Sequence, residues 1–312
     1  MALVAFSAAY AQQRLLAPGV WLLPGHFEIG RQPDGNTVVF AGRTGLIVMD
    51  TGRHASQREA IFELARSQQR PVVAIVNSHW HLDHTSGNEA LKQAFPAAQV
   101  HASAAVERIA KEVWPGSTAD LQAYLDSGKA SPALAEDIRG DIHAQTHPDA
   151  MRPDVVVTAS GAREIDGVTL DLHIATDAAT EGDVWVFDPR TRILAAGDLV
   201  TLPVPFLDTA CVEGWRASLK EIEATAFQVV IPGHGAPMDR ARFIAYRRGF
   251  EQYARCALSK SPADECAGGW LAATADIRDR SPAEDGRARD MALAYVALLR
   301  RGGGKSPLCR TS

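Results

Sequence analysis

The sequence lacks both a basic cluster and a long apolar run. Its 312 residues include 32 lysines and arginines against 37 aspartates and glutamates, a formal net charge of −5. Because clustered Lys and Arg are needed to bind phosphate backbones, nucleic acid is a poor candidate partner. No apolar stretch approaches the ~20 residues of a transmembrane helix, so we predict no membrane span. The hydrophobic share of 46% is that of an ordinary globular protein.

Cysteine is also scarce, and none of the four cysteines lies in a ligand motif. Cys256 and Cys266 flank a Ser-Lys-Ser-Pro turn, a spacing that favours a local disulfide. Cys211 and Cys309 would then pair and tie the C-terminal tail to the loop region after Asp198. The sequence alone allows three ways of pairing the four cysteines, or four free thiols.

The first residues resemble a secretory signal. Residues 1–12 contain an apolar run that ends in Ala-Tyr-Ala, like a signal cleavage site, although the positively charged start is absent. The alternative is an apolar N-terminal strand or extension. Together with the even number of cysteines, this pattern predicts a periplasmic or secreted protein, with a cytoplasmic one as the alternative.

Residues 79–84 read His-Trp-His-Leu-Asp-His and place four potential metal ligands in six positions. The chain has only ten histidines, so this density favours metal binding. The preceding segment, 71–76, is β-branched and apolar, which predicts a buried strand that gives way to a loop at residues 77–78.

The spacing within this motif predicts two ligand directions. On an extended segment His79 and His81 project to the same side, whereas Asp83 and His84 follow on the turn and face a second point. Imidazole and carboxylate suit zinc, and less selectively iron or manganese.

Two later motifs add one ligand each. Residues 193–198 form an apolar strand that ends in Gly-Asp198, and residues 229–235 form another that ends in Gly-His234-Gly. Either motif alone is a common turn. Their order after the histidine-rich motif makes them candidates for loops that carry function on a rigid scaffold.

Together these motifs resemble the metallo-β-lactamase fold superfamily. The matching segments are His-Trp-His-Leu-Asp-His at 79–84, Ala-Ala-Gly-Asp at 195–198, Pro-Gly-His-Gly at 232–235 and the strand ending in Asp-Thr-Gly at 45–52. The resemblance covers roughly residues 19–250 and implies an α/β fold, an αββα sandwich with one or two metal ions at one edge.

The resemblance also implies the role of each ligand. His79 and His81 would belong to the first metal site, and Asp83, His84 and His234 to the second. Asp198 would bridge the two sites. Asp83 or Asp198 would orient the attacking water and accept its proton.

One family ligand is missing. The family places a histidine in Gly-His-Thr-x-Gly-Asp, and the aligned position here is Ala179, whose methyl group cannot coordinate a metal. Asp177 is a possible substitute oxygen ligand. The alternative is a mononuclear protein, and we expect an occupied second site with an altered or weak first one.

The remaining pattern predicts the organisation of the chain. After the signal-like residues 1–12, we expect a hydrolase domain over 13–250 and a helical C-terminal extension over 251–312, packed on the same domain. Residues 102–142 predict two helices. His101 and His173 are interpreted as strand residues. The apolar loop 201–209 forms either a substrate wall or a packing segment under the helices.

These observations predict a metal-dependent hydrolase that acts on a small molecule, with one or two zinc ions as cofactor and iron or manganese as alternatives. Metal-bound hydroxide would attack an ester, lactone, thioester or β-lactam, and phosphate and sulfate esters are further candidates. The alternative, motivated by Ala179, is a non-catalytic metal-binding accessory protein. The oligomeric state is not predicted.

Overall fold

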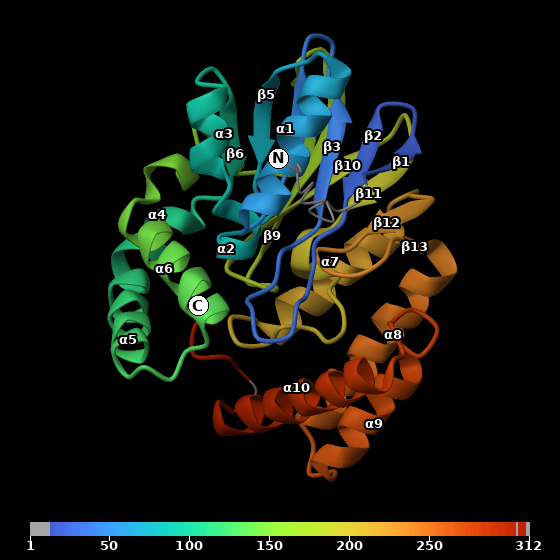
Figure 1. The fold of residues 1–312 in the computed structure, drawn as a ribbon. Helices are drawn as coiled ribbons and strands as arrows, with labels where there is room; N and C mark the ends of the chain where they lie inside the picture. Colours follow the sequence, from blue (N-terminus) through green and yellow to red (C-terminus); the bar gives the residue numbers. More distant parts are fainter. Residues whose placement is uncertain (1–12, 304, 310–312) are drawn as a thin grey trace, which may run out of the picture.

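The computed structural model describes residues 13–303 and 305–309. Two β-sheets pack face to face, and helices cover both outer faces (Figure 1). The predicted αββα sandwich is therefore confirmed, together with a helical C-terminal region. Residues 1–12, which carry the signal-like pattern, lie outside the described range.

The first sheet has seven strands in the order β1-β2-β3-β4-β5-β6-β7. Strands β1 to β4 pair antiparallel, and β4 to β7 pair parallel. The strands are β1 (Arg14–Ala17), β2 (Val20–Leu23), β3 (Thr37–Ala41), β4 (Leu46–Met49), β5 (Val72–Val76), β6 (Gln99–Ala102) and β7 (Val155–Val156).

The second sheet has six strands in the order β13-β12-β11-β10-β9-β8. Strands β11 and β12 are parallel, and the other neighbours are antiparallel. The strands are β8 (Gly161–Ile165), β9 (Val168–Thr176), β10 (Gly182–Asp188), β11 (Ile193–Ala195), β12 (Val229–Ile231) and β13 (Met238–Asp239).

The helices lie on the outer faces and at the ends of the sandwich (Figure 1). Apolar residues of α1 and α3 pack on the first sheet, and those of α7 and α8 on the second. The helices are α1 (Ala55–Gln68), α2 (Leu82–Thr85), α3 (Asn88–Ala94), α4 (Ala105–Glu112), α5 (Trp114–Asp126), α6 (Pro132–Thr146), α7 (Val212–Ala224), α8 (Arg240–Ala257), α9 (Ala263–Ala273) and α10 (Pro282–Arg301).

Hydrophobic side chains fill the space between the sheets because alternate residues of a strand point to opposite faces. In β4, Ile47 and Met49 point into this space, while Leu46 and Val48 pack beneath α1. Val184 of β10 reaches the same central core from the second sheet. Burial on both faces explains why β4 is a continuous apolar run.

Three helices, α4, α5 and α6, begin within residues 102–142, where the sequence predicts two. Two boundaries divide this segment, because Pro115 lies in the first turn of α5 and Pro132 in the first turn of α6. Proline is tolerated there because the first N–H groups of a helix have no intrahelical partner. The three helices pack beside the first sheet (Figure 1) and bury Trp114.

Two disulfides join the C-terminal region to itself and to the sandwich. Cys256 at the end of α8 is bonded to Cys266 in α9, and Cys211 before α7 is bonded to Cys309. These are the two favoured pairings, and the described residues contain no other cysteine. The second bridge ties the chain beyond α10 to the second layer of helices.

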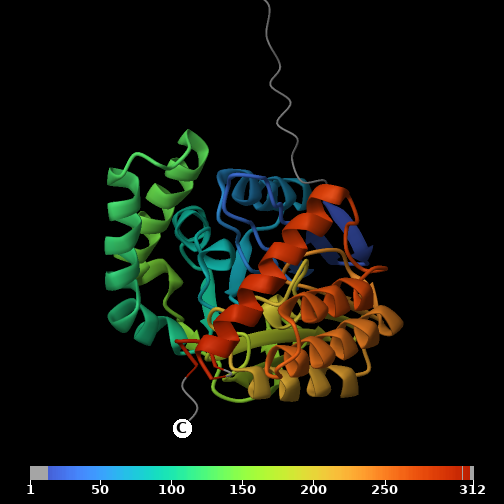
Figure 2. The ribbon, with the colours of Figure 1, turned by 90° about the horizontal axis from the view of Figure 1, so that it is seen from below.

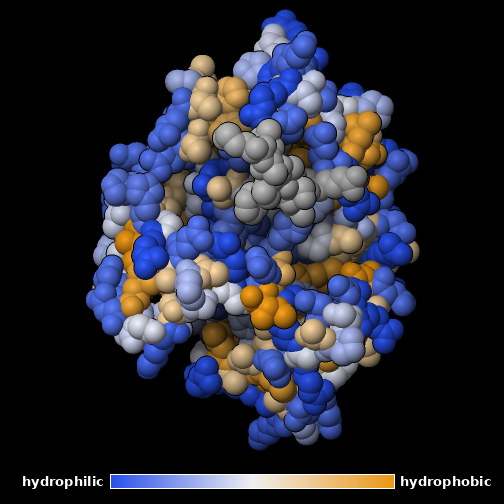
Figure 3. Space-filling model, in the orientation of Figure 1, coloured by the Kyte–Doolittle hydropathy of each residue, from blue (hydrophilic) through white to orange (hydrophobic). Residues whose placement is uncertain are grey.

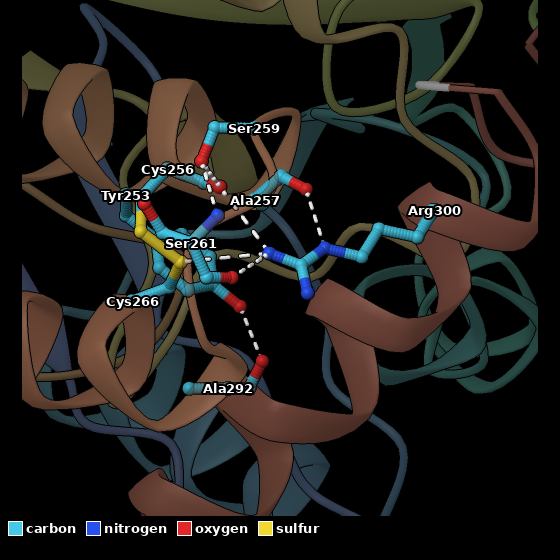
Figure 4. Close-up of a disulfide and its surroundings, with 8 residues drawn as sticks. All are labelled: Tyr253, Cys256, Ala257, Ser259, Ser261, Cys266, Ala292 and Arg300. Carbon is cyan, nitrogen blue, oxygen red and sulfur yellow. Dashed lines mark hydrogen bonds between the residues drawn. A yellow bond between two sulfur atoms is a disulfide. The ribbon is translucent and has the colours of Figure 1, made fainter.

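Helix α10 lies across the lower edge of the sandwich and packs against α8 and α9 (Figures 1 and 2). Near its end, Arg300 donates hydrogen bonds to the carbonyl oxygens of Ala257 and Ser261, beside the disulfide between α8 and α9 (Figure 4). Helix α8 runs unbroken across residue 250, so the extension continues from the last helix of the sandwich.

The face drawn in Figure 3 is mainly hydrophilic, with hydrophobic residues in small separate patches. Scattered apolar side chains of this kind are normal on a globular protein. Within the described residues, none of the helices combines the length and the apolar character that a membrane crossing requires.

Candidate metal centre

The candidate ligands sit in segments that follow three strands. His79 and His81 lie in the loop after β5, and Asp83 and His84 lie in the short helix α2 that follows it. Asp198 lies in a 3-10 turn after β11, and His234 lies in the loop after β12. Figure 1 shows β5 running toward the edge of the sandwich where α2 and α10 lie. The structure brings six predicted ligands together at this edge. They form two groups, and within each group the donor atoms lie within 4.8 Å of one another.

The second group consists of Asp83, His84 and His234, and an oxygen of Asp198 faces it. Nε2 of His84 lies 3.3 Å from Nε2 of His234, 3.6 Å from Asp83 Oδ2 and 3.4 Å from Asp198 Oδ1. His234 Nε2 lies 3.0 Å from Asp83 Oδ2 and 3.6 Å from Asp198 Oδ1. A tetrahedral zinc ion with ligands at ~2.0–2.1 Å separates its donors by about 3.3 Å, so this donor set fits such an ion.

The first group consists of His79, His81 and Asp198. His79 Nε2 lies 3.8 Å from Asp198 Oδ2. His79 Nε2 and both carboxylate oxygens of Asp198 are buried without a hydrogen-bond partner among the described residues. Because such atoms are costly unless paired, they mark a place where a cation fits. This group has three protein donors.

A second layer of residues fixes the ligand rings. Asp50, which directly follows β4 at a positive φ of 61°, places Oδ2 2.8 Å from Nδ1 of His84. The same carboxylate accepts hydrogen bonds from the backbone N–H and the hydroxyl of Ser78, and the Ser78 hydroxyl lies 2.9 Å from Nδ1 of His79. Both histidines are thereby held with Nε2 directed at the centre.

The electrostatics of the metal-free site are those of a buried cluster of acids and imidazoles. Burial opposes the charge of His84, but the neighbouring Asp198, Asp83 and Asp50 outweigh it and raise the pKa of His84 well above its ordinary value. The pKa of His234 is raised in the same way by Asp198 and Asp83. Conversely, burial disfavours the Asp198 carboxylate, yet His234 and His84 hold the pKa of Asp198 below its usual range. The carboxylates are therefore ionised and available as ligands.

Asp183 is a buried carboxyl group near the centre that is not a ligand. It accepts hydrogen bonds from the backbone N–H and the hydroxyl of Thr180. Burial raises the pKa of Asp183 to about 7, against the effect of these hydrogen bonds and with a contribution from the charge of Asp198. Asp183 holds the turn between β9 and β10, where the family histidine would lie.

Ala179 lies in that turn with its side chain in the hydrophobic core. Thr209 donates a hydrogen bond to its carbonyl oxygen at 2.8 Å and lies 3.4 Å from His81 Nε2 through the same hydroxyl. Burial lowers the pKa of His81. The negative charge of Asp208 opposes this effect most strongly, followed by the charges of Asp83 and Asp198. Asp177 is half-buried and belongs to neither ligand group.

The loop 201–209 combines the two roles that its sequence allows. Leu202, Val204 and Leu207 are buried under the helices of the C-terminal region. Phe206 instead faces the metal centre, with its ring 5.4 Å from that of His234. The loop is thus a packing segment whose remaining side chains border the site.

Other histidines lie outside the centre, as their sequence context indicates. His101 lies in β6, and His173 lies in β9, where it stacks on Trp185 at 3.6 Å and pairs with Glu221. Trp80 is half-buried and packs beside Leu82.

Sequence reasoning missed one residue at the site, Arg53, and one long-range contact, between Tyr295 and Asp208. Arg53 approaches Asp83 Oδ1 at 3.8 Å and forms an ion pair with Asp141 of α6. Tyr295 of α10 donates a 3.4 Å hydrogen bond to Asp208. No local motif signals either contact, because each joins distant parts of the chain.

A pocket of about 490 Å³ adjoins His234. Its walls come from the loops after β2 and β12 and from the C-terminal helices. Its lining combines apolar and charged side chains. The apolar ones include Phe27, Leu202, Pro203, Met238 and Ile277, and the charged ones come mainly from the C-terminal region, among them Arg242, Asp279, Glu284 and Arg287.

The chain matches the family model of the metallo-beta-lactamase superfamily over residues 30–234. Among curated proteins it is 26% identical over 221 residues to a linear primary-alkylsulfatase of a Pseudomonas strain, and 22% identical over 191 residues to an (R)-specific secondary-alkylsulfatase of a Pseudomonas species. These alignments span 62% and 57% of this chain but only 40% and 29% of the relatives.

Solved structures share the fold. A metallo-beta-lactamase from Pontibacter korlensis matches with a TM-score of 0.55 and 19% identity, over 77% of this chain and 98% of that one. A stereoselective inverting sec-alkylsulfatase from a Pseudomonas species matches with a TM-score of 0.61 and 18% identity, over 94% of this chain and 50% of that one. The second match extends into the C-terminal helices.

Proposed function

Because the chain belongs to the metallo-β-lactamase superfamily, a family of metal-dependent hydrolases, we propose that it hydrolyses a small molecule at a metal centre held by Asp83, His84, His234 and Asp198. The observation that carries this proposal is the convergence of these four side chains at spacings that suit one tetrahedral ion.

The donor types favour zinc. Two imidazoles and two carboxylates suit zinc best, and they also accept iron or manganese. A bound divalent ion would lower the pKa of water and polarise the oxygen of a scissile bond. His79 and His81 would hold a second, weaker ion together with Asp198.

The protein's own carboxylates would position the water. Asp83 and Asp198 stay ionised because His84 and His234 hold their pKa values low despite burial. Each can therefore accept a hydrogen bond from the attacking water and orient it. Arg53 lies near the Asp83 carboxylate and forms an ion pair with Asp141. It would therefore restrain the Asp83 carboxylate.

The pocket beside His234 supports a substrate with an apolar portion. Its lining of Phe27, Leu202, Met238 and Ile277 suits an alkyl or acyl chain whose reacting group lies at the metal centre. The two alkylsulfatase relatives make a sulfate ester the first class to test. A carbonyl substrate, namely an ester, thioester, lactone or β-lactam, is the second.

A substrate panel tests the proposal. Metal-free protein would be loaded with zinc, manganese or iron and assayed with a linear alkyl sulfate, a thioester, a lactone and a chromogenic cephalosporin. We expect turnover of one class that is abolished by a chelator and by His234→Ala. His147→Ala is the matched control, because His147 is exposed and outside the centre. No turnover under any loading would instead support a metal-binding accessory protein.

We also propose a periplasmic or secreted location. The structure has two disulfides, and disulfides persist in oxidising compartments. Cell fractionation with thiol labelling tests this: a cytoplasmic protein with four reactive thiols would contradict it.

A further inference from the structure

The segment 34–36, between β2 and β3, connects the two halves of the metal centre. The Gly35 N–H donates a hydrogen bond to the Asp83 carbonyl oxygen at 3.0 Å. The Asn36 N–H donates to the Gly233 carbonyl oxygen at 2.7 Å, directly before the ligand in the loop after β12. This short stretch of the first sheet layer therefore binds a ligand-bearing segment of its own layer and one of the opposite layer.

The side chain of Asn36 makes most of this connection. Asn36 is 4% exposed, and its Nδ2 group donates hydrogen bonds to the carbonyl oxygens of Pro232 and Gly235, each at 2.9 Å. Its Oδ1 accepts a hydrogen bond from the Gly25 N–H at 2.9 Å. The side chain and backbone of one residue thus bind the carbonyl groups of residues 232, 233 and 235, which enclose His234 on both sides.

The loop after β12 is held from two directions. On the side of the second sheet, the Gly233 N–H donates hydrogen bonds to the carbonyl oxygens of Gly197 and Val200, beside Asp198. On the side of the first sheet, the donors to its carbonyl oxygens come from Asn36. Because a buried carbonyl group without a donor costs free energy, loss of the amide should let this loop shift.

The same segment confines the His84 ring. A Cβ atom at Gly35 would overlap this imidazole, so the backbone of the segment lies directly against it. On its other side Asp34 anchors the segment, because the Asp34 carboxylate accepts hydrogen bonds from the backbone N–H groups of Arg53 and His54. The segment is therefore fixed at the start of α1 while it contacts both ligand-bearing segments.

We propose that Asn36 is a positioning residue of the second metal site, which fixes His234 relative to Asp83 and His84. Its side-chain hydrogen bonds all go to backbone groups, so Asn36 acts through the loop backbone and not as a ligand. It should therefore control the affinity and the geometry of this site and spare the first ligand group. The inference rests on the metal binding proposed above, and not on the hydrolysis.

Metal titrations of the full chain test this inference. Metal-free wild type, Asn36→Ala and the control Gln57→Ala would be titrated with zinc against a chromophoric chelator, and with cobalt to record the visible ligand-field spectrum. Gln57 is matched because it is also a buried amide with two donated hydrogen bonds, to the Leu23 carbonyl oxygen and the Thr37 hydroxyl. We expect Asn36→Ala to weaken the tighter zinc-binding step by roughly 10-fold or more and to shift its cobalt band. Gln57→Ala should change neither.

A second variant and a measurement on the wild type keep the test independent of how well Asn36→Ala folds. Asn36→Leu keeps a side chain in this space but has no donor, so its zinc affinity should be as low as that of Asn36→Ala. In the wild type, zinc should slow hydrogen exchange of the Gly25 and Asn36 N–H groups. The Gly45 N–H, which is bonded to the distant Asp166 carboxylate, should exchange at an unchanged rate.

The outcomes separate this inference from the proposed function. Wild-type zinc affinity in folded Asn36→Ala or in Asn36→Leu would overturn the inference alone, and so would an equal loss of affinity in Gln57→Ala. Exchange of the Asn36 N–H that zinc does not slow would overturn it as well. A wild type that binds no metal would overturn the proposed function too.

Discussion

Asp50 Oδ2 lies 2.8 Å from Nδ1 of His84, on the side of the ring opposite the nitrogen that faces His234. This contact fixes the orientation of the imidazole, so that a hydrogen at Nδ1 leaves the Nε2 lone pair for a metal. Because Asp50 also binds the Ser78 backbone, it links the end of β4 to the loop after β5. The metal centre is thus held from a strand that contributes no ligand.

Replacement of this carboxylate should weaken the metal site without unfolding the protein. We expect Asp50→Asn to lower zinc affinity by about 10–100-fold, because the His84 ring loses its charged acceptor. Competition with a chromophoric chelator measures this. Asp166→Asn is a matched control, since Asp166 also has a positive φ and accepts backbone hydrogen bonds, but far from the centre. Equal affinity of both variants would contradict the role of Asp50.

Gly233 should be intolerant of any side chain. A Cβ atom at this position would overlap Asp198 Oδ1, and the backbone beside it, so the carboxylate would have to move. We expect Gly233→Ala to lose bound metal in elemental analysis while Gly140→Ala keeps it, because a Cβ on Gly140 meets no atom within 4 Å. Metal content equal to that of the wild type would show that Asp198 is not constrained in this way.

Metal affinity should fall as the pH is lowered. Burial opposes protonation, but the carboxylates raise the pKa values of His84 and His234 above the ordinary value, so the metal-free site holds protons near neutrality. Metal binding must release them, and zinc affinity should therefore decrease from about pH 8 to about pH 6. Calorimetry in buffers of different ionisation enthalpy would count the released protons. Binding without proton release would refute the assignment.

The two disulfides should contribute unequally to stability. Cys211–Cys309 spans 98 residues and Cys256–Cys266 spans 10. By the chain-entropy estimate, loss of the longer bridge costs about 4–5 kcal/mol of unfolding free energy and loss of the shorter one about 3 kcal/mol. Urea unfolding of the two paired Cys→Ala variants measures the difference. A larger loss for the 256–266 pair would contradict the expected order.

The fold and the six candidate ligands could be predicted because the sequence patterns that indicate them are local. Each ligand group follows a short apolar strand. Strand β5 belongs to one sheet, and β11 and β12 form a parallel pair in the other, and the segments after all three meet at one edge. The helix count in 102–142 was too low by one, because Pro115 and Pro132 each lie in the first turn of a helix and so each marks the start of a new one.

Contacts between distant segments could not be predicted in this way. Tyr295 and Asp208 are 87 positions apart, and Thr209 and Ala179 are 30 positions apart. Neither pair has a periodicity or a motif that connects its members. Only the packing of α10 and of the loop 201–209 brings the members of each pair together.

The central claim is that His84 and its neighbours bind a catalytic metal ion. Its most direct test is the metal content of protein purified without chelators and dialysed exhaustively, compared between wild type, His84→Ala and the control His147→Ala. We expect at least one tightly held divalent ion per chain in the wild type and in His147→Ala, and its loss in His84→Ala. A wild type without metal, or an unchanged metal content in His84→Ala, would contradict the account.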